Sequence, residues 1–116
     1  MTKTEIEVIW NNYLEAYGNV SKEDRARLLR ASVTADVLSL NPGDECQGID
    51  ALTKHIEVFQ ARMAGAYFKV NRLQVHHDQL LSEWTLFKGD NVAIATGHTH
   101  AKFNERGLVT ELCGFF

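Results

Sequence analysis

Five histidines are the side chains of this sequence best suited to move a proton near neutral pH, and two of them lie two positions apart. His98 and His100 flank Thr99 in a stretch that alternates like a strand, so their side chains point to the same face. If that face lines a cavity, either histidine can act as a general acid or base. If it is the outer face, both belong to the surface or to a dimer interface.

The register of the hairpin around Lys88 decides which face carries these histidines, and the sequence allows two registers. A three-residue loop places Trp84 opposite Thr96, on the face of His98 and His100. A two-residue loop places Trp84 opposite Ala95, on the other face. Both registers stay open at this point.

A pair of histidines two apart on a strand also occurs in metal sites, which need a third and a fourth ligand. Only His76-His77-Asp78 offers another cluster, and it has the character of a turn at a strand end. His55 lies between Lys54 and Glu57 and is predicted to be a partly exposed helical residue. We therefore expect no metal and no cofactor.

Length and charge limit the class of protein. A chain of 116 residues with 45% hydrophobic residues is expected to form a single domain over residues 1–116. The net charge of −3 argues against nucleic-acid binding, which usually requires a basic surface. Arg25, Arg27 and Arg30 alternate with acids and are predicted to lie on a solvated helix face.

Cysteine usage and apolar runs suggest the compartment. Cys46 and Cys113 are far apart in the sequence and form no CxxC motif, which favours two reduced thiols. No export signal and no apolar run long enough for a membrane span is visible. The expected location is the cytoplasm.

The first half of the chain has helical periodicity. Residues 4–18 carry an apolar stripe, with Thr4 as the expected N-cap; it consists of Ile6, Ile9, Trp10, Tyr13, Leu14 and Tyr17. Ser21 is the expected N-cap of a short second helix. A strand over residues 37–40 and a short return follow, and residues 51–63 are predicted to form a third helix.

The second half alternates like a sheet, with strands expected over 67–76, 80–87, 92–103 and 108–116. The apolar phase slips near Asn71-Arg72, which predicts a bulge that bends the sheet. Short connections favour antiparallel pairing. The predicted fold class is α+β: a curved antiparallel sheet, with three helices from the N-terminal half packed on its concave side.

Several short segments, taken in order, resemble one known family. They are Trp10…Tyr13…Tyr17, Thr34-Ala35-Asp36-Val37, Asn41-Pro42, Gly48-Ile49-Asp50-Ala51-Leu52, Trp84, Thr96-Gly97 and Arg106-Gly107-Leu108-Val109. Together they resemble the SnoaL-like (polyketide-cyclase-type) branch of the nuclear transport factor 2-like (NTF2-like) superfamily, over nearly the whole chain. The resemblance implies a cone-shaped fold with an apolar cavity at its open end. Members include isomerases, cyclases, epoxide hydrolases, dehydratases and proteins that only bind or associate.

The resemblance transfers little of the catalytic chemistry. Steroid isomerases of this fold have a general-base Asp before the proline that ends the first strand, and Asn41 stands at that place here. Thr99 lies near the position of their protonated Asp, and Tyr13 matches their first-helix Tyr. A histidine would therefore have to act as the base.

These arguments converge on a pocket for a small apolar organic molecule. The expected ligand-binding residues are Trp10, Tyr17, Leu38, Asn41, Phe59, Trp84 and Leu112. For an enzyme that transfers a proton next to a carbonyl, the expected catalytic residues are His98 or His100 as base and Tyr13 as oxyanion donor. The alternative is a non-catalytic binding or dimerisation module. In either case we expect a homodimer through the outer face of the sheet.

Overall fold

The structure is a computed structural model that describes residues 1–116. Its helices are α1 (Lys3–Ala16), α2 (Lys22–Arg30) and α3 (Ile49–Arg62). Its strands are β1 (Val33–Asn41), β2 (Asp44–Gln47), β3 (Tyr67–His76), β4 (Gln79–Phe87), β5 (Ala93–Phe103) and β6 (Val109–Phe115). None of the three helices is long and apolar enough to cross a membrane.

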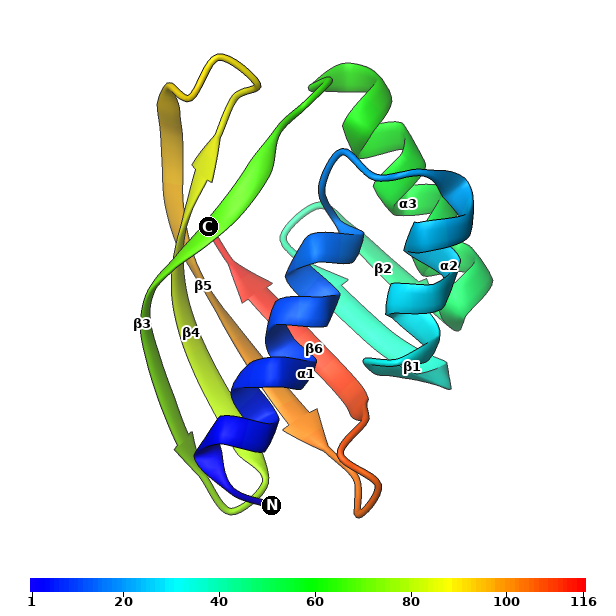
Figure 1. Ribbon diagram of the computed structural model, residues 1–116, viewed down its shortest axis with the longest axis vertical. Coiled ribbons are helices and arrows are strands. Elements are labelled where there is room, and N and C mark those ends of the chain that lie inside the picture. The colour runs from blue at the N-terminus through cyan, green and yellow to red at the C-terminus, as the bar shows by residue number, and fades with distance from the viewer.

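All six strands form one sheet in the order β2-β1-β6-β5-β4-β3. The long strands bend together, and α1 lies along the hollow of the curve with α2 and α3 beside it (Figure 1). The α+β class and the three helices in the N-terminal half are thereby confirmed. The sheet is open, because β2 and β3 are its two edges and do not pair with each other.

The sheet is mixed, which corrects the prediction of a purely antiparallel one. β1 runs parallel to β6, whereas the other four neighbouring pairs are antiparallel. Short connections force antiparallel pairing only between strands that follow one another in the chain. β1 and β6 are separated by α3 and all the other strands, so that argument does not constrain their direction.

Register shifts interrupt four of the five strand pairings, and those of β4 with its two neighbours bear on the predictions. The pairing of β3 with β4 shifts between Val70 and Arg72, which confirms the predicted bulge. The pairing of β4 with β5 shifts between Leu86 and Phe87. Because of that second shift, Trp84 lies opposite Gly97, and neither of the two registers predicted from loop length is correct.

The helices begin at local capping residues, and α1 and α3 begin earlier than the sequence predicted. α1 is capped by Thr2 rather than Thr4, and Thr2 and Glu5 form a reciprocal capping box. Ser21 caps α2 as predicted, with its hydroxyl accepting from the backbone N–H of Asp24 at 3.1 Å. α3 begins at Ile49, directly after Gly48, which has a φ of 92°.

Arg25 does not lie on a solvated face, contrary to the prediction for the α2 arginines. It is buried, and its guanidinium donates to the carbonyl oxygens of Ala16 and Gly18, each at 2.9 Å. These carbonyls lie at the end of α1, where backbone acceptors lack helical partners. The sequence of α2 does not reveal that Arg25 bonds these carbonyls, because the contact depends on how α1 and α2 pack.

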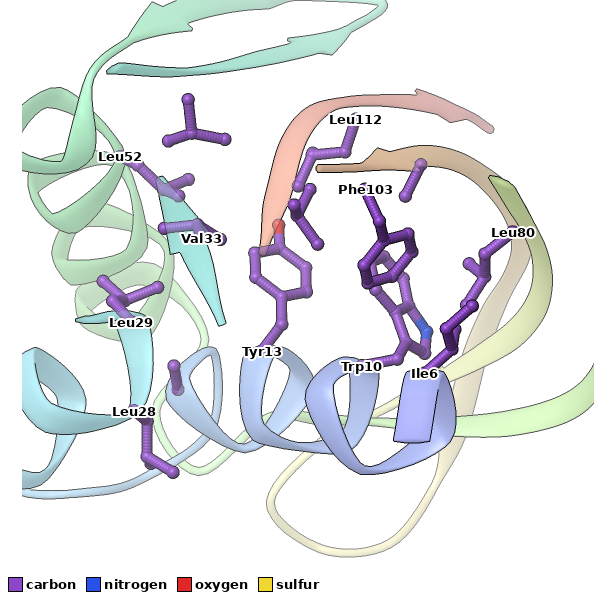
Figure 2. Close-up of a cluster of buried hydrophobic side chains, with 14 of the residues drawn as sticks. Ile6, Trp10, Tyr13, Leu28, Leu29, Val33, Leu52, Leu80, Phe103 and Leu112 are labelled. Carbon is purple, nitrogen blue, oxygen red and sulfur yellow. The ribbon is translucent and has the colours of Figure 1, made fainter. Parts of the chain in front are cut away.

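The core lies between α1 and the concave face of the sheet. Ile6, Trp10 and Tyr13 project from α1 toward Phe103 and Leu112 on the strands (Figure 2). Leu28, Leu29, Leu52 and Ile56 extend this core under α2 and α3. The apolar stripe of α1 that was predicted from the sequence therefore packs in the core, and part of it lines the pocket.

Candidate functional site

A pocket of about 640 Å³ opens between the concave face of the sheet and the helices α1 and α3. Hydrophobic residues make up 14 of the 22 that line it, so the pocket suits a ligand that is itself mostly apolar. The lining comes from α1 and α3 with their C-terminal ends, from all six strands, and from the terminal residue Phe116.

Of the residues predicted to bind a ligand, all but one line this pocket: Trp10, Tyr17, Asn41, Phe59, Trp84 and Leu112. Tyr13 lines it as well. Leu38 does not, whereas its neighbour Ser39 is buried and does. The prediction for Leu38 is off by one residue, and in a strand such a slip exchanges the two faces.

An uninterrupted series of aromatic rings forms much of the wall. The ring centroids of consecutive members lie between 4.9 and 5.8 Å apart, in the order Trp10, Tyr13, Tyr17, Phe68, Trp84 and Phe116. Phe59 packs on both Tyr17 and Phe68. Such rings supply large, rigid contact area for a flat apolar ligand.

The orientation of Trp84 is fixed from two sides. Its indole N–H donates to the hydroxyl of Thr99 at 2.9 Å. A Cβ on Gly97 would lie 2.6 Å from the Trp84 ring, so only glycine allows the ring to sit over this strand. The small residues of β5 therefore make room for an aromatic side chain from β4.

Tyr13 on α1 is buried and Tyr17 at its C-cap is partly buried, and both line the pocket. Neither phenol hydroxyl forms a hydrogen bond with another protein group. Burial raises the pKa of Tyr13 well above its usual value, and Tyr17 and Cys46 add to this. Burial also raises the pKa of Tyr17, and Cys46 and Asp44 raise it further. Both phenols therefore stay protonated and can donate hydrogen bonds to a ligand.

Three side chains with acid–base or metal-binding chemistry meet at one edge of the pocket. Nδ1 of His55 lies 3.1 Å from Oδ2 of Asp44, and the thiol of Cys46 donates to the same oxygen at 3.8 Å. The backbone N–H of Glu45, together with the imidazole of His55, lowers the pKa of Asp44. Burial and the nearby carboxylate raise the pKa of Cys46. Asp44 and His55 line the pocket.

His98 and His100 lie on the opposite, outer face of the sheet, because Trp84 pairs with Gly97. Nε2 of His98 is 3.7 Å from Oε2 of Glu83, and both side chains are exposed. Nε2 of His100 is 3.0 Å from Oε1 of Gln79, in a separate pocket of about 170 Å³. The expectation that one of them acts as base in the main pocket does not fit this placement.

The sequence reasoning missed Asp44 and Cys46 and treated His55 as a surface residue. His55 is partly exposed as predicted, with 26% of its side chain accessible. Asp44 and Cys46 are two apart on β2, so they share a face, and that spacing was the available signal. Only the packing of α3 beside β2 brings His55 to that face.

The sequence matches no protein-family model and no curated protein. Solved structures nevertheless share its fold. A proposed isomerase of the SnoaL-like family from Agrobacterium tumefaciens aligns with a TM-score of 0.88 at 21% identity, over 97% of each chain. A proposed polyketide cyclase from Sinorhizobium meliloti aligns with a TM-score of 0.76 at 14% identity, over 98% of this chain and 99% of its own.

A de novo designed protein with a curved β-sheet is also similar, with a TM-score of 0.77 at 15% identity over 98% of this chain and 86% of its own. Such identities establish the fold and nothing finer. They confirm the fold that the sequence resemblance implied. A designed chain in this fold illustrates that the architecture forms without any particular chemistry, so function must be argued from the pocket.

Proposed function

We propose that this chain, which has the fold of the SnoaL-like branch of the NTF2-like superfamily, binds a small, largely apolar organic molecule that carries a carbonyl-type oxygen. The observation that carries the proposal is the pair of phenol hydroxyls of Tyr13 and Tyr17, which have no protein hydrogen-bond partner and belong to residues that line an aromatic pocket. A hydroxyl in the pocket that has no protein partner is free to donate a hydrogen bond to an acceptor on the ligand.

The pocket sets the size and shape of the ligand. Its volume of about 640 Å³ falls within the range of ordinary small-molecule sites. Trp84, Phe68 and Phe59 all line the pocket and would supply aromatic contacts to a ring of the ligand. The oxygen of the ligand would lie toward Tyr13 and Tyr17, and its apolar body toward Trp84.

A second candidate function, proton transfer next to a carbonyl, is favoured by the pairing of His55 with Asp44. An imidazole that donates from Nδ1 to a carboxylate has its Nε2 free to accept a proton, and the carboxylate stabilises the resulting cation. In this role His55 removes a proton from the carbon next to the carbonyl. Tyr13 and Tyr17 then donate hydrogen bonds to the enolate oxygen that forms. The alternative remains a module that binds without catalysis.

Binding is tested by a thermal-shift screen of hydrophobic ring ketones, each paired with the analogue that lacks the oxygen, in the presence of a chelator. We expect the ketones to bind about tenfold more tightly than their analogues, the worth of one good hydrogen bond. Tyr13→Phe and Tyr17→Phe should reduce this preference. Tyr67→Phe, outside the pocket, is the matched control. If neither class of compound shifts the melting temperature of the wild type, the proposal is wrong.

Proton transfer is tested by following deuterium exchange at the carbon next to the carbonyl of a bound ketone in D₂O by NMR. We expect exchange to fall at least about 100-fold in His55→Gln, which is the usual contribution of a general base. His98→Gln and His100→Gln are the matched controls and should exchange like the wild type. Binding without any accelerated exchange would favour the non-catalytic module.

A further inference from the structure

Asp44, Cys46 and His55 form the only group of three side chains in this structure whose metal-ligating atoms converge. From this cluster we infer a binding site for one divalent transition-metal ion of the zinc type. The inference does not depend on the proposed function of the pocket.

The donor atoms are spaced as such an ion requires. Bonds of about 2.0–2.3 Å at tetrahedral angles hold ligand atoms roughly 3.3–3.6 Å apart. In the structure Oδ2 of Asp44 is 3.1 Å from Nδ1 of His55 and 3.8 Å from Sγ of Cys46. All three donor atoms lie within 4.8 Å of one another. Small side-chain rotations would complete the geometry.

The backbone holds these donors in place. Asp44 and Cys46 share one face of β2, and both residues pair with β1. α3 begins directly after β2 and carries His55 near its middle. The turn between them is anchored at Gly48, whose N–H donates to the carbonyl oxygen of Val37 at 2.7 Å. Because two ligands lie on a strand and one on a packed helix, the backbone positions of the three ligands are well defined.

The mixture of donors points to the kind of ion. Thiolate and imidazole favour zinc and its close relatives over magnesium or calcium, which prefer oxygen ligands alone. Three protein ligands leave one position open, as in catalytic rather than structural zinc sites. Because Asp44 and His55 line the pocket, a water or a ligand oxygen would enter that position from the pocket.

Metal binding would replace the contacts that these groups make without a metal. The ion would displace the proton shared by His55 and Asp44 and the thiol proton of Cys46, so binding releases protons. His55 could not ligate through Nδ1 and keep its hydrogen bond to Asp44 at the same time. A bound ion and an acid–base role that relies on this hydrogen bond are therefore alternative states of the same residues.

The test is a titration of the untagged, chelator-treated protein with Co²⁺, followed by optical absorption. We expect one equivalent to bind, with an intense visible spectrum typical of tetrahedral cobalt and a thiolate-to-cobalt charge-transfer band. Cys46→Ser should abolish the charge-transfer band, and Asp44→Asn and His55→Gln should each weaken binding by at least about tenfold. Cys113→Ser, which removes the other free cysteine, is the matched control and should behave like the wild type.

A double variant, His76→Gln with His77→Gln, controls for the exposed histidine pair at the end of β3 and should also bind like the wild type. Far-ultraviolet circular dichroism verifies that each variant is folded. A wild type without the charge-transfer band, or a Cys46→Ser variant that retains it, overturns the inference. Since the ketone screen uses a chelator, failure of the metal site leaves its result unaffected.

Discussion

At the scale of single residues, Gly97 has the most restricted position in the site. It lies opposite Trp84 in the β4–β5 pair, with the indole ring over it and the hydroxyl of Thr99 holding the indole N–H. A Cβ there would also lie 2.9 Å from the carbonyl oxygen of Phe115, which belongs to a backbone that cannot move independently. The shape of the pocket therefore depends on the absence of a side chain.

Gly97→Ala is expected to lower the free energy of unfolding by about 1–3 kcal/mol, because it overpacks a filled space. Urea denaturation measures the effect. Gly43→Ala is the matched control, since a Cβ there would meet only the Asn41 side chain, at 4.0 Å. A loss in Gly97→Ala no larger than in the control would mean that Trp84 has another position available.

At the scale of elements, a buried arginine connects α2 to the end of α1, the helix that carries the aromatic stripe. Arg25 of α2 is buried and donates to two carbonyl oxygens at the end of α1. Tyr17 lies between these two acceptors in the chain. Arg25 thus links the placement of the pocket phenols to the docking of α2.

Arg25→Met keeps the apolar stem but removes both hydrogen bonds, and we expect it to cost about 2 kcal/mol of stability. Arg27→Met is the control, because Arg27 is 63% exposed and pairs only with Asp24, so its loss should cost less than about 0.5 kcal/mol. Chemical denaturation compares the two variants. Equal losses would show that the buried guanidinium contributes no more than a surface one.

At the scale of the whole molecule, the two faces of the curved sheet differ in what they contact. The concave face carries the core and the pocket, and the convex face carries His98 and His100 beside exposed apolar residues. Leu81 and Phe115 are 39% and 60% exposed on this outer face. Exposed apolar side chains grouped on one face favour association. We propose that a homodimer forms there.

Leu81→Glu is expected to shift the protein from dimer to monomer, because it places a charge in the proposed interface. Val8→Glu is the matched control, since Val8 is 54% exposed on α1, away from the sheet's outer face. Sedimentation velocity over a range of concentrations measures the outcome. A wild type that stays monomeric throughout, or a control that dissociates equally, would contradict the proposed dimer.

Much of this protein is determined locally, and the sequence alone sufficed there. The helical stripe of α1, the Ser21 cap, the bulge between Val70 and Arg72 and the α+β order all follow from periodicity and turn chemistry over short stretches. The sequence also predicted five of the seven aromatic rings that line the pocket, and missed Phe68 and Phe116. A large apolar side chain on the inward-facing stripe of a helix or strand is usually buried.

Tertiary structure decided everything that depends on register or on the meeting of distant segments. One extra residue in β5 put His98 and His100 outside the pocket, because a shift of one residue in a strand exchanges its faces. The parallel pairing of β1 with β6 and the meeting of His55 with Asp44 join segments that no local pattern relates. The sequence by itself determined the elements and their apolar faces, whereas packing alone decided which polar groups face the pocket.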